Sequence, residues 1–337
     1  MQTRALGRTG PTVSVIGLGA MGMSDLYGPA DEAEGIATIH AAIDAGVNLI
    51  DTADFYGSGH NELLIHRALQ ERSREDVVIS VKFGSQRDPA GGWAHAGADV
   101  SPAAVKDRLA YTLRRLGTDY VDIYRPSRVN PEIPVEDTVG AIKEMIEAGY
   151  VRHIGLSEVG ADTIRRAASV HPISDLQIEY SLLSRDMEDT ILPTTRELGI
   201  GITAYGVLSR GLLSGHWSSG RELAAHDFRA TLAPRFKGEN LEANLRLVDA
   251  LRDVAGDLGI TVAQVAIAWV ASRGDDIVPL VGARRRERLA ESLGAAEVML
   301  DADDLARIEK AIPAGAASGG RYADFLLQGM DSERWSP

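Results

Sequence analysis

The segment Asp-Thr-Ala-Asp-Phe-Tyr-Gly, which begins at Asp51, and the lysine at position 82 contain the residue types needed to give a proton to a carbonyl oxygen. A free tyrosine has a pKa of about 10 and is a poor acid at neutral pH. A neighbouring ammonium group lowers that pKa by stabilising the phenolate, and a carboxylate keeps the lysine charged and oriented. Asp51, Tyr56 and Lys82 together therefore predict a tyrosine that protonates an oxygen gaining negative charge. The alternative is a structural salt bridge beside a packed tyrosine.

These residues must come from elements whose ends meet, and the chain alternates short apolar runs with segments of helical spacing. The apolar runs are continuous, as expected of parallel strands covered on both faces. They are Val13–Leu18, Val47–Asp51, Val77–Lys82, Val121–Tyr124, Ile154–Ser157, Leu176–Glu179, Ile200–Ala204 and Ile277–Leu280. The helical segments are Ala33–Ala45, Asn61–Glu71, Pro102–Leu116, Val135–Ala148, Ala161–Ser169, Met187–Leu198 and Val262–Ser272. The alternation predicts an α/β fold in which residues 1–337 form a single (β/α)8 barrel, a TIM barrel, after a short N-terminal hairpin.

Long irregular stretches are expected to surround the site. Asp51 and Lys82 end neighbouring strands, and barrels of this kind hold their active sites at the C-terminal face. Residues 83–100 and 206–240 follow strands and are therefore expected at that face, whereas residues 313–337 form a C-terminal tail. The tail either closes over the pocket or packs on the outer wall of the barrel.

A two-domain dinucleotide-binding fold is the competing architecture, because residues 17–22 match G-x-G-x-x-G after an apolar run. Such a turn should open a helix at once and be followed by an acidic residue about 20 positions later. Here a Gly-Pro turn at positions 28 and 29 intervenes, and the acidic end of the next strand, Asp51, lies further along the chain. The barrel is therefore the favoured fold.

The composition limits the expected partners. The formal charge of −13 disfavours binding to nucleic-acid phosphates or to an anionic membrane surface. The chain has no cysteine, no apolar leader at its N-terminus, and no apolar stretch of the roughly 20 residues that a membrane helix needs. The 8 histidines lack metal-binding spacing, so no metal site is expected. We expect a cytoplasmic protein with a small-molecule substrate, and the pattern indicates no oligomeric state.

The order of several motifs strongly resembles that of the aldo-keto reductase superfamily. Gly-Leu-Gly at 17–19 is followed by the segment that begins at Asp51 and then by Val-Lys-Phe-Gly at 81–84. Further matches, which extend the resemblance over nearly the whole chain, are IGLSEV at 154–159, QIEYSLLSR at 177–185, AYGVLSRGLLSG at 204–215 and VGARRRERLAESLGA at 281–295. The resemblance implies NADPH-dependent reduction of an aldehyde or ketone, in which Tyr56 is the general acid and Asp51 and Lys82 tune it.

The resemblance also implies the residues that hold NADP(H). Ser157, Glu158 and Gln177 would hydrogen-bond the nicotinamide carboxamide, and Tyr205 would stack on the nicotinamide ring. The other implied contacts are Leu208, Ser209 and Arg210 along the pyrophosphate, Arg284, Arg288 and Glu291 at the adenosine end, Ser292 where the family often has asparagine, and Gly19, Ala20, Met21 and Gly282. Guanidinium groups at the start of a helix suit a phosphate monoester, so the arginines favour NADP over NAD. At least one of them is expected on a solvated helix face.

One position departs from the family pattern. At the fourth strand end the family usually reads Tyr-x-x-His-Arg, but this chain reads Tyr-Arg-Pro-Ser-Arg from Tyr124 to Arg128, so Ser127 stands at the histidine position. A serine hydroxyl donates one hydrogen bond and carries no charge at neutral pH. Either Ser127, or a water beside it, orients the carbonyl while Arg125 supplies positive charge from the same strand face, or the site is simply weaker.

The substrate is the least readable part of the sequence. The Arg-Pro-x-Arg pattern is similar to a bacterial branch that includes pyridoxal reductase-like and pyridoxine dehydrogenase-like enzymes, and other members act on bulky alicyclic ketones. Trp93 and Trp217, in the two long loops, either line the substrate pocket or cap their loops. Two further hypotheses stay open: an NADP(H)-binding sensor or regulatory subunit with weak catalysis, and a barrel isomerase or lyase that needs no nicotinamide.

Overall fold

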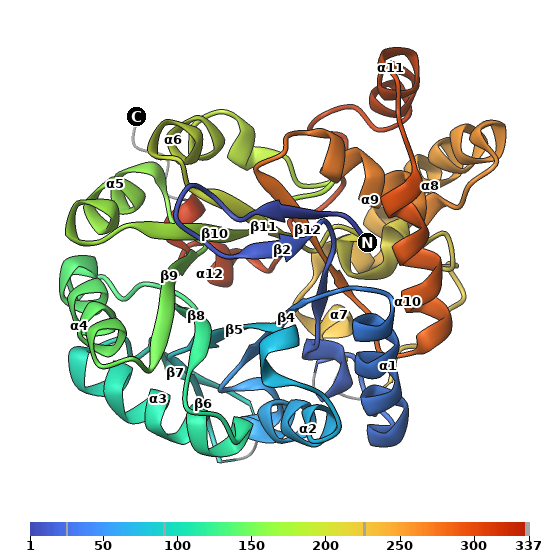
Figure 1. Cartoon of the computed structure of the whole chain (residues 1–337). Coiled ribbons are helices and arrows are strands. Elements are labelled where there is room, and N and C mark those ends of the chain that lie inside the picture. Colours follow the sequence, from blue (N-terminus) through green and yellow to red (C-terminus); the bar gives the residue numbers. More distant parts are fainter. Residues whose placement is uncertain (25, 90–91, 225–226, 334–337) are drawn as a thin grey trace.

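The structure, a computed structural model, describes residues 1–24, 26–89, 92–224 and 227–333 of the chain. Within these residues, eight parallel strands close into a barrel in which each strand pairs with the next along the chain and the last pairs with the first (Figure 1). The strands are β3 (Gly17–Gly19), β4 (Leu49–Ala53), β5 (Val78–Phe83), β8 (Val121–Pro126), β9 (Val151–Ser157), β10 (Ile173–Glu179), β11 (Gly201–Tyr205) and β12 (Ile277–Gly282). The predicted (β/α)8 barrel is confirmed.

Helices surround the barrel (Figure 1), and most begin and end within two residues of the predicted bounds. They are α1 (Glu32–Asp44), α2 (His60–Leu69), α3 (Pro102–Leu116), α4 (Val135–Glu147), α5 (Ala161–Val170), α6 (Ile191–Leu198), α8 (Gly238–Leu258), α9 (Val262–Ser272), α10 (Arg286–Leu293) and α11 (Ala302–Ala311). Local signals explain the accurate ends. Ser101 caps α3, with proline at its first position, and Thr261 forms a capping box with Gln264 at the start of α9.

The first predicted strand, Val13–Leu18, is wrong in one respect, because the structure divides it between two elements. β2 (Thr12–Ser14) pairs antiparallel with β1 (Thr3–Ala5) in the N-terminal hairpin, and the barrel strand β3 starts only at Gly17. The Ser14 hydroxyl donates to the carbonyl oxygen of Ile16 at 2.7 Å, which stabilises the bend between the two strands. The hairpin joins the apolar floor of the barrel, which consists of Leu6, Val13, Leu49, Ile123 and Val278.

The three long stretches contain more regular structure than the sequence predicts. They hold the hairpin β6 (Ser85–Arg87) and β7 (Trp93–Ala98), the turns η5 (Ser209–Ser214), α7 (Phe228–Thr231) and η6 (Pro234–Phe236), and the tail elements α12 (Asp324–Leu327) and η8 (Asp331–Glu333). The helix α8 was missed altogether, although Val248, Leu251 and Ala255 bury one face of it at helical spacing.

Across the described residues, no single helix has the length and apolar character to cross a membrane. The helices α8 and α9 meet those criteria only as a pair, across a bend of 88°.

Candidate active site

Asp51, Tyr56 and Lys82 come together at the C-terminal end of the barrel, as predicted. Asp51 lies on β4 and Lys82 on the adjacent strand β5, and their side chains form a buried ion pair between Oδ1 and Nζ. The Lys82 ammonium also donates to the carbonyl oxygen of Thr52 at 3.1 Å. Tyr56 begins the turn η2 (Tyr56–Gly59) that follows β4, and its ring centroid is 4.9 Å from the Lys82 nitrogen. The lysine therefore lies between the carboxylate and the phenol ring.

The hydrogen bonds around Asp51 fix its carboxylate as an acceptor. Besides the Lys82 ammonium, it accepts from the Ser80 hydroxyl at 3.0 Å and from the Gln177 amide at 2.7 Å. Arg125 donates to the Ser80 oxygen at 3.0 Å, and a guanidinium group can only donate. The single proton of Ser80 is therefore directed to Asp51. Three donors therefore hold the Asp51 carboxylate in place beside the Lys82 ammonium.

The pKa of Tyr56 differs from the sequence-based expectation. Burial raises the pKa of Tyr56 well above 10, and the charge of Asp51 raises it further, whereas the charge of Arg128 lowers it. Burial also lowers the pKa of Lys82, although Asp51 opposes that shift. The predicted lowering of the Tyr56 pKa is thus wrong for this structure, because desolvation of the phenolate outweighs the nearby ammonium. Tyr56 is a firmly protonated donor.

Arg125 does not supply positive charge at the mouth of the site, which corrects a prediction from the sequence. Its side chain is fully buried inside the barrel, where it pairs with Asp175 through bonds of 2.8 and 3.2 Å and donates to the Leu156 carbonyl oxygen at 3.2 Å. The arginine whose charge lowers the pKa of Tyr56 is instead Arg128, just beyond β8. The sequence did not lead to Arg128, although this residue ends the Tyr-Arg-Pro-Ser-Arg motif.

Ser127 is buried, and its hydroxyl lies 2.7 Å from that of Ser85, the first residue of the hairpin strand β6. Two hydroxyls hold two protons, and their mutual bond uses one of them. The pair can therefore still donate one hydrogen bond to a third group. The sequence did not identify Ser85, because its contact with Ser127 depends on how the hairpin folds over the barrel mouth.

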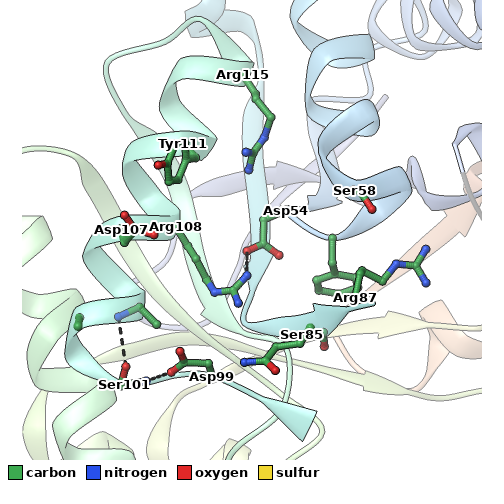
Figure 2. A pocket seen from close by; sticks show the side chains of 14 residues that line it. Asp54, Ser58, Ser85, Arg87, Asp99, Ser101, Asp107, Arg108, Tyr111 and Arg115 are labelled. Carbon is green, nitrogen blue, oxygen red and sulfur yellow. Dashed lines mark hydrogen bonds and ion pairs between the residues drawn. The ribbon is translucent and has the colours of Figure 1, made fainter. Parts of the chain in front are cut away.

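A cavity of about 720 Å³ adjoins this site (Figure 2). Its lining is polar and includes Ser85 together with Asp54, which pairs with Arg108 at 3.1 Å. Phe55 also lines it, but its neighbour Tyr56 does not. Tyr56 is thus not part of the cavity lining, whereas Ser85 of the hydroxyl pair is.

The residues predicted to contact the nicotinamide meet at the ends of β9, β10 and β11. Ser157 is the register partner of Gln177, and Tyr205 is the register partner of Glu179. Because the Gln177 amide nitrogen donates to Asp51, its carbonyl oxygen is directed away as an acceptor, which fits the N–H of a carboxamide. Both oxygens of Glu158 accept from groups of the chain itself, so a contact between Glu158 and a carboxamide requires some of those bonds to open.

The segment predicted to follow the pyrophosphate fits an anion in part. In η5, Ser209, Arg210 and Gly211 all have positive φ, and the Ser209 hydroxyl is buried without a partner among the described residues. Such a donor suits a phosphate oxygen. Arg210 is less suited, since its guanidinium is held by Glu179 at 2.8 Å.

The arginine segment around α10 divides into two kinds of residue. Arg284 donates to the backbone oxygens of Tyr27 and Pro29, and burial together with the charges of Arg285 and Arg229 lowers its pKa. An anion would relieve that repulsion, so this locus fits a 2′-phosphate. The remaining residues form pairs with each other or with neighbours: Arg288 with Glu291, and Arg286 with Glu34. Arg286 is thus the solvated helix-face arginine that the sequence predicted.

The other predicted contacts vary in how well they fit. Gly19 ends β3, the Ala20 amide donates to the Asp51 carbonyl oxygen at 3.0 Å, and Met21 packs against the cluster that contains Tyr56. Gly282 ends β12 with open space where a Cβ would stand, and Ser292 is buried.

Neither tryptophan is shown to line a substrate pocket. Trp217 is buried, packs on Phe236 with ring centroids 4.7 Å apart, and lies under Arg229, contacts that favour the alternative in which it caps its loop. The side chain of Trp93 lies outside the described residues. In the described ranges, no group of three or more His, Asp or Glu side chains is placed to hold a metal ion.

Comparisons with known proteins agree with this geometry. A family model described as the aldo/keto reductase family matches residues 15–313. A curated relative, "Probable aldo-keto reductase 1" of Glycine max, is 39% identical over 341 residues, covering 99% of this chain and 94% of the relative.

Two solved structures are also similar. A glycerol dehydrogenase from Gluconobacter oxydans has a TM-score of 0.82 at 27% identity, with 92% of this chain and 94% of that chain covered. An aldo-keto reductase from Bacillus halodurans has a TM-score of 0.75 at 26% identity, with 94% and 97% covered.

Proposed function

This chain belongs to the aldo/keto reductase family, whose members reduce carbonyl groups with a nicotinamide cofactor, and we propose that it uses NADPH to reduce an aldehyde or ketone with Tyr56 as proton donor. The observation that carries the proposal is the buried Asp51–Lys82 ion pair beside the Tyr56 ring. A buried ion pair costs desolvation energy and is weak evidence for stability alone. Its position against a buried phenol supports a catalytic role.

The chain's own residues carry out the proton transfer. When bound, the cofactor supplies a hydride to the carbonyl carbon. Tyr56, protonated because burial raises its pKa, gives its proton to the carbonyl oxygen as that oxygen gains charge. Lys82, whose nitrogen lies 4.9 Å from the centre of the Tyr56 ring, stabilises the resulting phenolate, and Asp51 opposes the burial that lowers the pKa of Lys82.

A second hydrogen bond to the carbonyl oxygen comes from the Ser85–Ser127 hydroxyl pair. This pair retains one proton to donate. It follows the ends of the paired strands β5 and β8, and β5 is also the neighbour of β4. Arg128 adds positive charge that Tyr56 already senses. In this proposal the three groups together replace the imidazole that the family usually has at position 127.

The substrate class rests on the resemblance alone. The Arg-Pro-x-Arg pattern supports a pyridoxal-like aldehyde or a bulky alicyclic ketone. Cytoplasmic location and the lack of nucleic-acid or membrane partners remain predictions from the acidic, cysteine-free composition. The choice of NADPH over NADH is supported by the Arg284 locus, where positive charges repel one another.

The test is an NADPH fluorescence titration followed by NADPH consumption with a carbonyl panel that includes pyridoxal, alicyclic ketones and glyceraldehyde. Tyr56→Phe removes only the transferable proton, so turnover should fall by about 10²–10⁴-fold while NADPH affinity stays within about twofold. Tyr150→Phe, at an exposed site in the turn between α4 and β9, is the matched control.

Each outcome separates the hypotheses. Turnover that survives in Tyr56→Phe refutes the assignment of the proton donor. Tight NADPH binding without turnover of any carbonyl transfers support to the sensor hypothesis, and no binding at all supports the isomerase or lyase hypothesis.

A further inference from the structure

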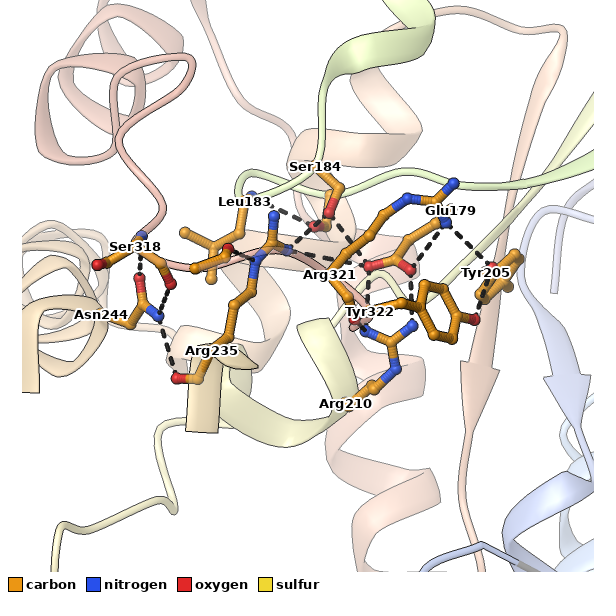
Figure 3. Close-up of polar contacts among 12 residues, drawn as sticks. Glu179, Leu183, Ser184, Tyr205, Arg210, Arg235, Asn244, Ser318, Arg321 and Tyr322 are labelled. Atoms are coloured by element: carbon orange, nitrogen blue, oxygen red, sulfur yellow. Dashed lines mark hydrogen bonds and ion pairs between the residues drawn. The ribbon is translucent and has the colours of Figure 1, made fainter. Parts of the chain in front are cut away.

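Five charged side chains form a buried cluster over β9, β10 and β11 at the barrel mouth (Figure 3). Two are carboxylates with no exposed side-chain surface, Glu158 just after β9 and Glu179 at the end of β10. Three are arginines that are 6–7% exposed: Arg210 in η5, Arg235 in η6 and Arg321 in the C-terminal tail. Buried charges are costly unless they are paired, and here each carboxylate meets at least one guanidinium.

Arg321 is the residue that joins the two carboxylates. Its guanidinium donates to both oxygens of Glu158, at 3.0 and 2.6 Å, and also to Glu179 at 3.3 Å. Arg210 holds the backbone of the same residue, because it donates to the Arg321 carbonyl oxygen at 2.8 Å. Glu158 and Arg321 are 163 positions apart in the sequence, so this contact joins the C-terminal tail to the barrel.

The tail is attached on both sides of Arg321. Upstream, the Ser318 amide donates to Asn244 on α8 at 2.8 Å. Downstream, the Ser332 hydroxyl donates to Glu158 at 2.7 Å, and Asp331 accepts from the Gly160 amide at 2.8 Å. The path of residues 318–333 across β9 and β10 is therefore specified by polar contacts rather than by loose packing.

The attached tail contacts the ring that family resemblance places under the nicotinamide. The Tyr205 hydroxyl donates to Glu158 at 2.7 Å, the same oxygen that accepts from Arg321. It also lies 3.1 Å from the hydroxyl of Tyr322, and the Tyr322 ring stacks under Arg210 at 4.2 Å. Arg321 also donates to the Tyr205 hydroxyl itself at 3.4 Å, so it contacts Tyr205 both directly and through the shared Glu158 oxygen.

The saturation of Glu158 explains why its role differs from a simple cofactor contact. A carboxylate offers about four acceptor sites. The Glu158 carboxylate accepts five hydrogen bonds, two from Arg321 and one each from Tyr205, Ser332 and the Glu179 amide, so its acceptor sites are fully used. A side chain so occupied holds other groups in place.

We propose that residues 318–333 form a wall at the nicotinamide end of the cofactor site, and that Arg321 is the positioning residue that orients Tyr205, by its own hydrogen bond and through Glu158. This inference rests on the proposed NADPH-dependent function and adds the tail to its site. Loss of the guanidinium leaves two buried carboxylates facing each other with fewer donors, which would displace Glu158 and release the Tyr205 hydroxyl. At the adenosine end, Arg286 and Arg288 pair with Glu34 and Glu291 rather than with this cluster, and Arg229 links the Arg284 locus to the backbone oxygen of Arg210 at 3.1 Å.

The experiment compares the affinities of Arg321→Gln for NADPH and for 2′,5′-ADP, a probe that carries the adenosine end without nicotinamide. Isothermal titration should show NADPH binding weakened by about tenfold or more, whereas 2′,5′-ADP binding changes by less than about twofold. Arg321→Lys should fall between, since an ammonium cannot bridge both carboxylates in the same fork geometry. Arg307→Gln on α11, which removes an exposed pair with Asp257 on α8, is the matched control and should change neither affinity.

A second readout uses the unmodified chain, in which trypsin can cleave after Arg321 only when the tail opens. Saturating NADPH should slow cleavage at this bond by about tenfold, and saturating 2′,5′-ADP should not. This measurement keeps the inference testable if Arg321→Gln fails to fold. Tyr322→Phe, which removes only the hydroxyl beside Tyr205, should weaken NADPH binding by a smaller factor of about two to five.

Three outcomes overturn the inference. They are an unchanged NADPH affinity in Arg321→Gln, an equal loss of affinity for NADPH and 2′,5′-ADP in that variant, and equal protection of the Arg321 bond from trypsin by the two ligands. Failure of the unmodified chain to bind either probe would instead refute the proposed function itself.

Discussion

Replacing Arg125 by methionine tests whether the buried pair inside the barrel is held as the structure describes. Neither Arg125 nor Asp175 has any exposed side-chain surface, and the guanidinium makes two bonds to the carboxylate. The surroundings are shaped for the pair. A Cβ added to Gly155 would lie 2.8 Å from the Arg125 guanidinium carbon, so glycine is needed there to admit the arginine.

The expected cost follows from what the substitution leaves behind. Removing one partner of a buried ion pair typically destabilises a protein by about 3–5 kcal/mol, because the other charge stays buried and unpaired. Asp175 would keep two donors, the hydroxyls of Thr203 at 2.5 Å and Ser174 at 2.9 Å. We therefore expect Arg125→Met to lower the free energy of unfolding by about 3 kcal/mol, at the lower end of that range.

Urea unfolding monitored by circular dichroism measures this cost. The double variant Arg125→Met/Asp175→Leu removes the orphaned charge and should recover about 2 kcal/mol relative to the single variant. Arg165→Met, which breaks a bidentate but half-exposed pair with Glu197, should cost less than about 1 kcal/mol. A single variant as stable as the Arg165 control, or a double variant less stable than Arg125→Met, would refute the reasoning.

Three further predictions concern the site. Burial and the charge of Asp51 raise the pKa of Tyr56 well above 10, so the kcat/KM for carbonyl reduction, measured by stopped-flow NADPH consumption, should stay constant from about pH 6 to about pH 9. A fall in kcat/KM toward high pH within that range, with a midpoint that shifts in Lys82→Met, would contradict this. Ser127→Ala should lower kcat by about tenfold or more with NADPH affinity unchanged, and Ser85→Ala should lower it less because Ser127 keeps its proton; steady-state kinetics with full activity in Ser127→Ala would sink the hydroxyl-pair proposal. Burial alone would raise the pKa of Glu158, but the charge and hydrogen bonds of Arg321 outweigh it and hold that pKa far below 4.5. The stabilisation is therefore complete above the unfolded-state pKa and is lost as pH falls toward the folded-state pKa. The Tm advantage over Glu158→Gln should stay constant above about pH 5 and shrink from about pH 5 to about pH 3, and an advantage that stays constant down to about pH 3 would count against the ion pair.

Much of the site was predictable because it follows from regular elements. Asp51 and Lys82 end adjacent parallel strands, and parallel strands of a barrel carry their C-terminal ends to one face. Ser80 was within reach of the same reasoning, since it lies two residues before Lys82 and so on the same face of β5.

The roles of Arg125 and Arg128 were not predictable in the same way. Alternation correctly turns Arg125 inward, but the depth at which an inward side chain ends depends on the tilt of all strands in the closed barrel. Arg125 pairs in register with Lys82, yet its side chain lies in a layer with Asp175 beneath the catalytic residues. Arg128 lies beyond the strand, where the period of two no longer applies.

The sequence by itself determined the barrel, the positions of most of its strands and helices, and the meeting of Asp51, Lys82 and Tyr56, because apolar periodicity and helix caps act over a few neighbouring residues. Tertiary structure alone decided that burial raises the Tyr56 pKa, that Ser85 reaches Ser127, and that Arg321 joins Glu158 to the tail. Those features depend on desolvation and on contacts between residues up to 163 positions apart, which leave no periodic trace in the chain.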